Sequence, residues 1–222
     1  MILCEKLRFS YPGDGFELRV DRFQVETGSS VALVGPSGCG KTTLLNLIAG
    51  ICSPDSGTVQ VGDTELECLS EKVRQAFRLK TIGMVPQNFE LLDYLTVSEN
   101  LLVPFRISGD GRVPDGAGER VSELLERAGI ANHRDKFPSR ISQGERQRVA
   151  MCRGLISAPP VILADEPTGN LDPENQEKIV ALLLEEASRI GATVLMITHE
   201  PELKRHFDRV IDVLELRGEA LE

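Results

Sequence analysis

The segment from Gly35 to Thr42 constrains the fold of this chain more than any other feature. It reads Gly-Pro-Ser-Gly-Cys-Gly-Lys-Thr, which fits the spacing G-x-x-x-x-G-K-S/T of loops that wrap around phosphate. A strand-forming apolar run, Ser30–Val34, precedes it, and residues 43–49 follow it as a predicted helix that Gly50 ends. A glycine-rich turn can match this spacing by accident, but rarely between a strand and a helix. We therefore predict a strand–loop–helix unit that binds phosphate.

Each residue type in this loop suits an anion. Glycines let backbone N–H groups curl around a phosphate without a clash from Cβ, and the positive end of the helix dipole faces the same anion. We expect the Lys41 ammonium to reach the terminal phosphates and the Thr42 hydroxyl to help hold Mg²⁺. The nucleotide-binding residues predicted here are Gly35, Pro36, Ser37, Gly38, Cys39, Gly40, Lys41, Thr42 and Thr43.

Charge and cysteine content limit the classes of partner. The formal net charge is −9, which disfavours nucleic acid because phosphate backbones attract basic patches. The 5 cysteines include no C-x-x-C pair, which favours a reduced compartment over a disulfide framework. Apolar runs such as 179–184 are too short to span a bilayer, and no N-terminal signal peptide is predicted. We therefore expect a cytoplasmic protein that does not bind nucleic acid.

The order of predicted elements indicates an α/β fold. Residues 1–30 alternate apolar and polar side chains and predict antiparallel strands, with another short strand at 57–62. From 31 to 87 and from 159 to about 216, apolar strands alternate with amphipathic helices, which indicates a parallel sheet. The later strands are predicted at 161–164, 193–197 and 209–214, and a helix at 173–190.

Residues 90–157 read as wholly helical. The candidate helices are 97–106, 119–129 and 143–157, and the glycine- and proline-rich stretch 108–118 predicts a surface loop. A helical block inserted into an α/β core suggests a lobe that can rotate. We expect a single domain, 1–222, in which 1–87 and 158–222 form the core with its antiparallel β lobe and 88–157 form the helical lobe.

A buried-type strand, 161–164, is followed by two adjacent carboxylates, Asp165 and Glu166. Unpaired buried carboxylates are costly, so a functional partner is expected at this edge of the sheet, where α/β proteins bind ligands. Asp165 fits an acid associated with Mg²⁺, and Glu166 fits a carboxylate that orients or deprotonates an attacking water. Solvated acids at a strand end are the ordinary alternative, which the phosphate loop makes less attractive.

A second anion site is predicted where Ser142 begins a helix. Glu145 follows three residues later, which is the pattern of a capping box. Ser142 could simply cap its helix. A capped helix start beside Gly144 can also offer N–H donors and a positive dipole end to an anion.

With these motifs in this order, the chain resembles the nucleotide-binding subunit of ABC transporters over essentially its full length. The resemblance implies an ATPase with a P-loop NTPase core, a parallel sheet, an N-terminal antiparallel β subdomain and an inserted α-helical subdomain. It implies ATP and Mg²⁺ as ligands, Glu166 as the catalytic carboxylate and Asp165 as the metal-associated acid.

The same resemblance assigns roles to residues that carry no signal alone. Gln87 is similar to the Q-loop glutamine that senses Mg²⁺ and the γ-phosphate, and His199 to the switch histidine. Asp172 ends a D-loop that begins at Asn170, and Tyr11 matches the aromatic residue that stacks on adenine. Each could instead be an ordinary strand-end or turn residue; their joint order favours the functional interpretation.

The signature segment, Ile141 to Glu145, departs from the family's usual Leu-Ser-Gly-Gly-Gln at two functional positions. Gln143 brings a side chain to a place where backbone normally approaches phosphate. Glu145 adds negative charge near the same anion. Ser142 and Gly144 are retained, so we expect the segment to bind nucleotide.

Family resemblance also supplies the partners. Two copies are expected to pack head to tail around two ATP molecules, with Ser142 and Gly144 acting on the nucleotide of the other copy. Bound ATP would close this homodimer through charge-assisted contacts, and hydrolysis would let it reopen. A separate integral membrane permease is implied, which would place the protein peripherally on the inner face of the cell membrane.

Two local features bear on the kind of transporter. The apolar residues after Gln87 form either a groove for the permease or the core of the helical lobe; they are Phe89, Leu91, Leu92, Tyr94 and Leu95. The segments 164–172 and 95–100 look most like the lipoprotein-releasing and macrolide-export branch, which works by mechanotransmission. Cell-division ABC ATPases, importers and soluble non-transport ABC ATPases remain alternatives.

Overall fold

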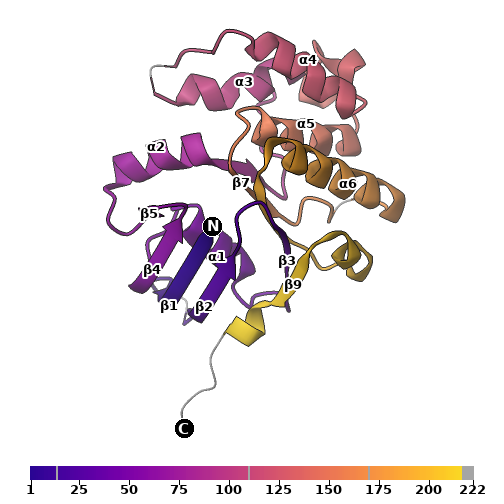
Figure 1. The fold of residues 1–222 in the computed structure, drawn as a ribbon. Helices are drawn as coiled ribbons and strands as arrows, with labels where there is room; N and C mark the ends of the chain where they lie inside the picture. The colour runs from indigo at the N-terminus through magenta and orange to yellow at the C-terminus, as the bar shows by residue number, and fades with distance from the viewer. Residues whose placement is uncertain (14, 110, 170, 217–222) are drawn as a thin grey trace.

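Two β-sheets, one antiparallel and one parallel, share a hydrophobic core. The computed structural model describes residues 1–13, 15–109, 111–169 and 171–216. The helices α3 (Val97–Ile107) and α4 (Ala117–Arg127) lie at the end of the molecule opposite the antiparallel sheet, and α5 (Gln143–Leu155) and α6 (Pro173–Ile190) lie between them and the parallel sheet (Figure 1). This arrangement agrees with the predicted α/β class.

The antiparallel sheet contains the N-terminal strands that the alternation of residues 1–30 predicts. Its strand order is β2-β1-β4-β5. The bounds are β1 (Ile2–Ser10), β2 (Glu17–Val25), β4 (Ser56–Val61) and β5 (Thr64–Glu65). Mostly alternate residues of β1 and β2 are buried, because successive side chains of a strand point to opposite faces. The predicted strands are confirmed, and β5 is an addition to them.

The parallel sheet forms the centre of the fold, with the strand order β6-β7-β8-β3-β9. The bounds are β3 (Ser30–Val34), β6 (Ile82–Val85), β7 (Val161–Asp165), β8 (Thr193–Ile197) and β9 (Arg209–Asp212). In β7, Leu163 packs into the core shared with the antiparallel sheet, whereas Ile162 and Ala164 pack into the core beneath the helices. Both faces are covered, which explains the continuous apolar run of this strand.

One predicted strand is too long. β9 ends at Asp212 rather than at residue 214, and Val213–Leu216 form a 3₁₀ turn. The Asp212 carboxylate accepts a hydrogen bond from the Leu214 backbone N–H at 2.9 Å. Such a local side-chain bond offers the backbone an alternative to the sheet ladder and ends the strand.

The helices include those predicted from sequence, with small shifts at their ends. Their bounds are α1 (Lys41–Ile48), α2 (Glu71–Thr81), α3 (Val97–Ile107), α4 (Ala117–Arg127), α5 (Gln143–Leu155) and α6 (Pro173–Ile190). α4 ends two residues before the prediction, ahead of Gly129, which has a φ of +68° and so favours a helix end. Among the described helices, none combines the length and apolarity that crossing a bilayer requires.

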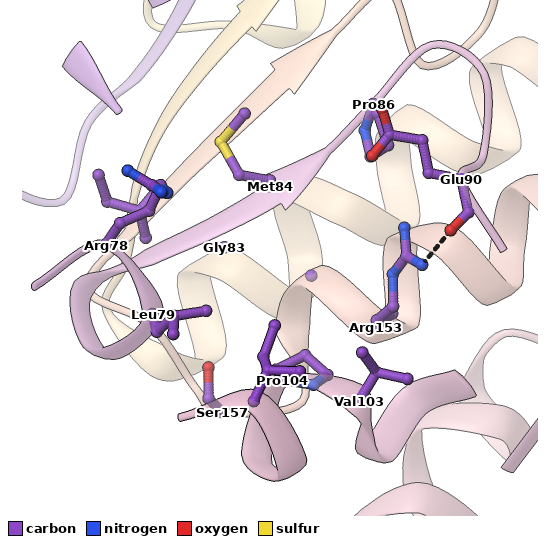
Figure 2. A pocket seen from close by; sticks show the side chains of 13 residues that line it. Arg78, Leu79, Gly83, Met84, Pro86, Glu90, Val103, Pro104, Arg153 and Ser157 are labelled. Carbon is purple, nitrogen blue, oxygen red and sulfur yellow. Dashed lines mark hydrogen bonds between the residues drawn. The ribbon is translucent and has the colours of Figure 1, made fainter. Parts of the chain in front are cut away.

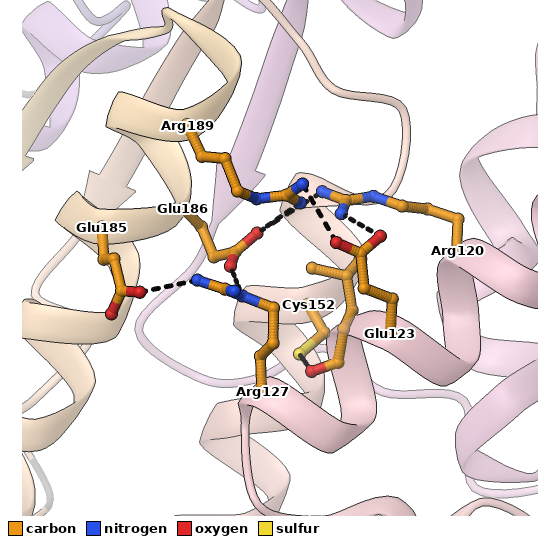
Figure 3. Close-up of polar contacts among 8 residues, drawn as sticks. Arg120, Glu123, Arg127, Cys152, Glu185, Glu186 and Arg189 are labelled. Atoms are coloured by element: carbon orange, nitrogen blue, oxygen red, sulfur yellow. Dashed lines mark hydrogen bonds and ion pairs between the residues drawn. The ribbon is translucent and has the colours of Figure 1, made fainter.

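A cluster of charged side chains joins α4 to α6, and Figure 3 shows it. We call it the α4–α6 charge cluster; it consists of Arg120, Glu123, Arg127, Glu185, Glu186 and Arg189. The Glu186 side chain is 1% exposed and accepts hydrogen bonds from Arg127 and, at 3.0 Å, from Arg189. A buried carboxylate is tolerated when cations surround it, so the cluster fixes how α4 sits on α6.

Candidate functional site

The phosphate loop connects β3 to α1 at the carboxyl edge of the parallel sheet. α1 begins at Lys41, and Gly40 before it has a φ of +102°, a conformation that favours glycine. The Lys41 ammonium donates to the carbonyl oxygens of Gly35 and Pro36, both at 2.9 Å, and the residue is only 5% exposed. The loop therefore curls around this ammonium and holds a positive charge at the helix N-terminus.

Asp165 meets the phosphate loop at the end of β7. The Thr42 hydroxyl donates to its Oδ1 atom at 3.3 Å. Burial raises the pKa of Asp165, and the hydrogen bond from Thr42 partly opposes that effect. The pair offers hydroxyl and carboxylate oxygens, the donor atoms that Mg²⁺ prefers. The residues present therefore fit the predicted metal.

Glu166 lies where three predicted motifs converge. One carboxylate oxygen, Oε1, lies 2.6 Å from His199 Nε2, and the other, Oε2, accepts a hydrogen bond from Gln87 Nε2 at 3.3 Å. Its backbone φ is +44°, which is uncommon for a residue with a side chain. The turn after β7 thus aims this carboxylate at Gln87 and His199, which follow the neighbouring strands β6 and β8.

A cavity of about 410 Å³ opens over the loop. Its lining residues are Tyr11, Phe16, Ser37, Gly38, Gly40, Lys41, Thr42, Thr43, Glu166 and His199. Tyr11 is half-exposed and packs edge-on against Phe9, with 4.8 Å between ring centroids. Phe16, which directly precedes β2, is a site residue that sequence reasoning missed; its place in the apolar alternation of residues 1–30 was the visible signal. Two aromatic rings beside the phosphate loop suit the stacking of a base.

Six predicted nucleotide-binding residues are not among the lining residues of this cavity: Gly35, Pro36 and Cys39 of the phosphate loop, and Ser142, Gly144 and Asp172 outside that loop. Ser142 caps the N-terminus of α5 and forms the predicted capping box with Glu145. Asp172 caps α6 by accepting from the Asn175 backbone N–H at 3.1 Å. Asn170 of the predicted D-loop lies outside the described residues. Ser142 and Asp172 therefore have local structural roles as helix caps, and neither lines the cavity of its own copy.

A second cavity, of about 260 Å³, lies where α2 and β6 meet α3 and α5, and Figure 2 shows its lining. Arg153 of α5 forms part of this lining and donates to the carbonyl oxygens of Phe89 and Glu90 at 2.7 and 2.6 Å. The apolar residues that follow Gln87 do not line this cavity; they are Phe89, Leu91, Leu92, Tyr94 and Leu95. Leu91 packs against the core beneath the helices, and Tyr94 is 74% exposed. Arg153 is therefore another residue that sequence reasoning missed, because only the fold brings it to this loop.

Comparison with known proteins identifies the family. Residues 18–169 match the family described as ABC transporter. The chain is 40% identical over 215 residues to the lipoprotein-releasing system ATP-binding protein LolD of Cereibacter sphaeroides, covering 95% of each chain. This chain belongs to the ABC transporter ATP-binding proteins. The resemblance predicted from sequence is confirmed, and with it an ATPase that binds ATP.

Other relatives of this ABC ATPase agree. It is 39% identical over 187 residues to the macrolide export ATP-binding/permease protein MacB of Rhodopirellula baltica, covering 84% of this chain and 27% of that protein. The structure superposes on the dimeric post-hydrolysis state of the ATP-binding cassette MJ0796 bound to ADP and Pi with a TM-score of 0.86 at 31% identity. That match covers 96% of this chain and 94% of the cassette, which confirms the predicted fold class.

Proposed function

We propose that this ABC ATPase works as a homodimer that closes on two ATP molecules and drives a separate membrane permease. The observation that carries the proposal is the convergence of Glu166, Gln87 and His199 beside the phosphate loop. A carboxylate held within hydrogen-bond distance of its neighbours is what water activation requires. We divide the chain, as predicted, into a core and a helical lobe, 88–157, that moves relative to it.

Within one copy, the loop residues bind the triphosphate. The Lys41 ammonium faces the β- and γ-phosphates, and the backbone N–H groups of the loop cradle them. Thr42, Asp165 and Gln87 would hold Mg²⁺, which would supply positive charge against the phosphate oxygens. Glu166 orients the attacking water and accepts its proton, while His199 fixes the carboxylate. Tyr11 supports the adenine.

The other half of each site comes from a second copy. Ser142, Gly144 and Asp172 do not line the cavity of their own copy, which agrees with a role toward a partner's nucleotide. The related cassette MJ0796 is dimeric with ADP and Pi bound. Cleavage of ATP removes the γ-phosphate that links the two halves, so the closed dimer loses contacts and reopens.

The cavity of Figure 2 is the proposed seat of the permease. Its lining combines apolar side chains such as Met84 and Val103 with Arg78 and Arg153. It lies next to the segment that follows Gln87, because Arg153 binds the carbonyl oxygens of Phe89 and Glu90. Movement at Gln87 can therefore be transmitted along the backbone to Phe89 and Glu90, and through their hydrogen bonds with Arg153 to a permease helix that occupies this cavity.

The named relatives favour the branch predicted from sequence. Both LolD, described as lipoprotein-releasing, and MacB, described as exporting macrolides, are about 40% identical to this chain. We propose a mechanotransmission transporter whose ATPase lies on the inner face of the membrane. A cell-division complex, an importer or a soluble non-transport ATPase are the other candidates.

Two measurements test this function. Light scattering with Glu166→Gln protein should detect dimers with ATP and monomers with ADP; a monomer under both conditions would contradict the dimer. Co-expression with a LolD-type membrane permease should give a complex that survives purification in detergent. Val103→Asp, inside the cavity, should reduce recovery of the complex about tenfold, whereas Tyr94→Asp, outside it, should not. Loss with both variants or with neither would contradict the proposed seat.

A further inference from the structure

The signature segment of this protein contains a carboxylate, Glu145, and both of its oxygen atoms make polar contacts. Its Oε2 atom accepts from the Ser142 backbone N–H at 2.8 Å and from the Ser142 hydroxyl at 2.9 Å. Its Oε1 atom lies 2.7 Å from His133 Nε2. The bond from the Ser142 N–H is the largest cause of the lowered pKa of Glu145, so the group is a charged acceptor beside the proposed partner-nucleotide site.

His133 lies in the 3₁₀ turn Ala131–His133 before α5 and is only 9% exposed. Its second ring nitrogen, Nδ1, lies 2.8 Å from the Lys136 Nζ atom. A lysine ammonium has only donors, so Nδ1 must accept. The ring proton therefore sits on Nε2 and is donated to Glu145. The result is a continuous hydrogen-bond chain from Lys136 through the His133 imidazole to Glu145 and Ser142.

These hydrogen bonds have two effects on the signature segment: they offset the charge of Glu145, and they leave the Ser142 hydroxyl able to turn toward phosphate. A γ-phosphate that approaches Ser142 meets the negative charge of Glu145 nearby, and repulsion between like charges weakens binding. The Lys136 ammonium, which the imidazole connects to the carboxylate, offsets that charge. The Ser142 hydroxyl also has a single proton to give, so it must leave Glu145 in order to donate to phosphate. A carboxylate fixed from the His133 side keeps its bond to the Ser142 N–H while the hydroxyl turns.

We infer that His133 and Lys136 are positioning residues for the signature: they orient Glu145 and offset its charge, so that the Ser142 hydroxyl can meet the nucleotide of a second copy. The inference rests on the proposed ATP-closed dimer and deepens it. It also explains how a signature with an acid at position 145 can serve an anion.

The test measures ATP-driven dimerisation in a Glu166→Gln background, where turnover does not consume the nucleotide. His133→Leu and Lys136→Met should each raise the ATP concentration for half-maximal dimer formation, by about threefold or more for His133→Leu. ATP binding to the Lys41 loop in dilute monomer should stay within about twofold. His133→Gln should recover most of the loss, because its amide can accept from Lys136 and donate to Glu145.

A second mutation separates positioning from mere packing. Glu145→Gln removes the charge that needs compensation, so adding His133→Leu to it should change dimerisation less than about twofold. A structural role would give equal losses with Glu145 present or replaced. Lys72→Met, an exposed site on α2, is the matched control for Lys136→Met, which is also exposed and should fold normally.

Three results have distinct meanings. If the Glu166→Gln parent does not dimerise with ATP, the proposed function fails and this inference fails with it. If the parent dimerises but His133→Leu and Lys136→Met behave like it, the inference alone is overturned. Equal losses from His133→Leu with and without Glu145→Gln also overturn it.

Discussion

The carboxylate of Glu166 lies 2.6 Å from Nε2 of His199, although the two residues follow different strands. β7 and β8 pair in parallel, with Asp165 beside Ile197, so the residues just after them emerge at the same edge of the sheet. The Glu166 backbone N–H also donates to the Ile197 carbonyl oxygen at 3.2 Å. This bond fixes the turn that holds the left-handed Glu166 conformation.

Glu166→Gln is expected to lower the ATPase rate at least about 100-fold, because the amide cannot accept a proton from water. ATP binding should be retained, since the loop residues are unchanged. Phosphate release and equilibrium nucleotide titration measure the two effects. Glu202→Gln, at an exposed site, is the control. An unaltered rate in Glu166→Gln would remove this residue from the chemistry.

Asp165→Asn is expected to stabilise the nucleotide-free protein while it removes Mg²⁺-supported turnover. Burial raises the pKa of Asp165 above its usual 3.8, so the folded protein binds that proton more tightly than the unfolded chain does. The ionised carboxylate therefore costs stability, fully at pH values above the raised pKa and not at all below about 3.8. The amide carries no such penalty.

Thermal unfolding of Asp165→Asn checks this sign. Its Tm should exceed that of the parent protein at pH 7, and the gain should shrink as the pH falls toward 4. The ATPase rate should fall at least about 100-fold, because a ligand of the metal is lost. Asp63→Asn, at an exposed turn, should leave both quantities unchanged. A lower Tm at pH 7 would show that Asp165 stabilises the fold instead.

Particular residues show which features of the fold and of the site the sequence predicts and which it does not. The sequence assigns both Thr42 and Asp165 to Mg²⁺ and expects a functional partner where the strand before Asp165 ends, and the structure brings the two side chains into hydrogen-bond contact there. The prediction for β9 failed because a single bond from Leu214 to Asp212 ends the strand, and periodicity does not register such a bond. The contacts of Arg153 and His133 were missed because the packed fold makes them: Arg153 joins α5 to the carbonyl oxygens of Phe89 and Glu90, and His133 joins its turn to Glu145 at the start of α5.

Glu186→Ala is expected to destabilise the protein by about 2 kcal/mol. The buried carboxylate holds Arg127 and Arg189 together, and removing it leaves these cations with only the more exposed carboxylates of Glu185 and Glu123 as partners. The loss is smaller than for a fully buried pair, because the Arg127 and Arg189 side chains are 32% and 39% exposed. Glu185→Ala is the matched control: its exposed carboxylate also binds Arg127, so about 0.5 kcal/mol or less is expected. Urea unfolding measures both, and equal losses would contradict the special position of Glu186.

Mixing two inactive variants tests which copy supplies each half of the site. Lys41→Ala removes the ammonium that the loop encloses, and Ser142→Arg places a bulky cation at the start of α5. Each protein alone should show little turnover.

In a mixed dimer, one of the two sites combines the intact loop of the Ser142→Arg copy with the intact signature of the Lys41→Ala copy, whereas the other site has both defects. If the two sites turn over independently, an equimolar mixture should regain roughly a quarter of the normal ATPase rate, because about half of randomly formed dimers are mixed and each has one good site. A mixture that remains as inactive as its components would place Ser142 on the nucleotide of its own copy, or outside the site altogether.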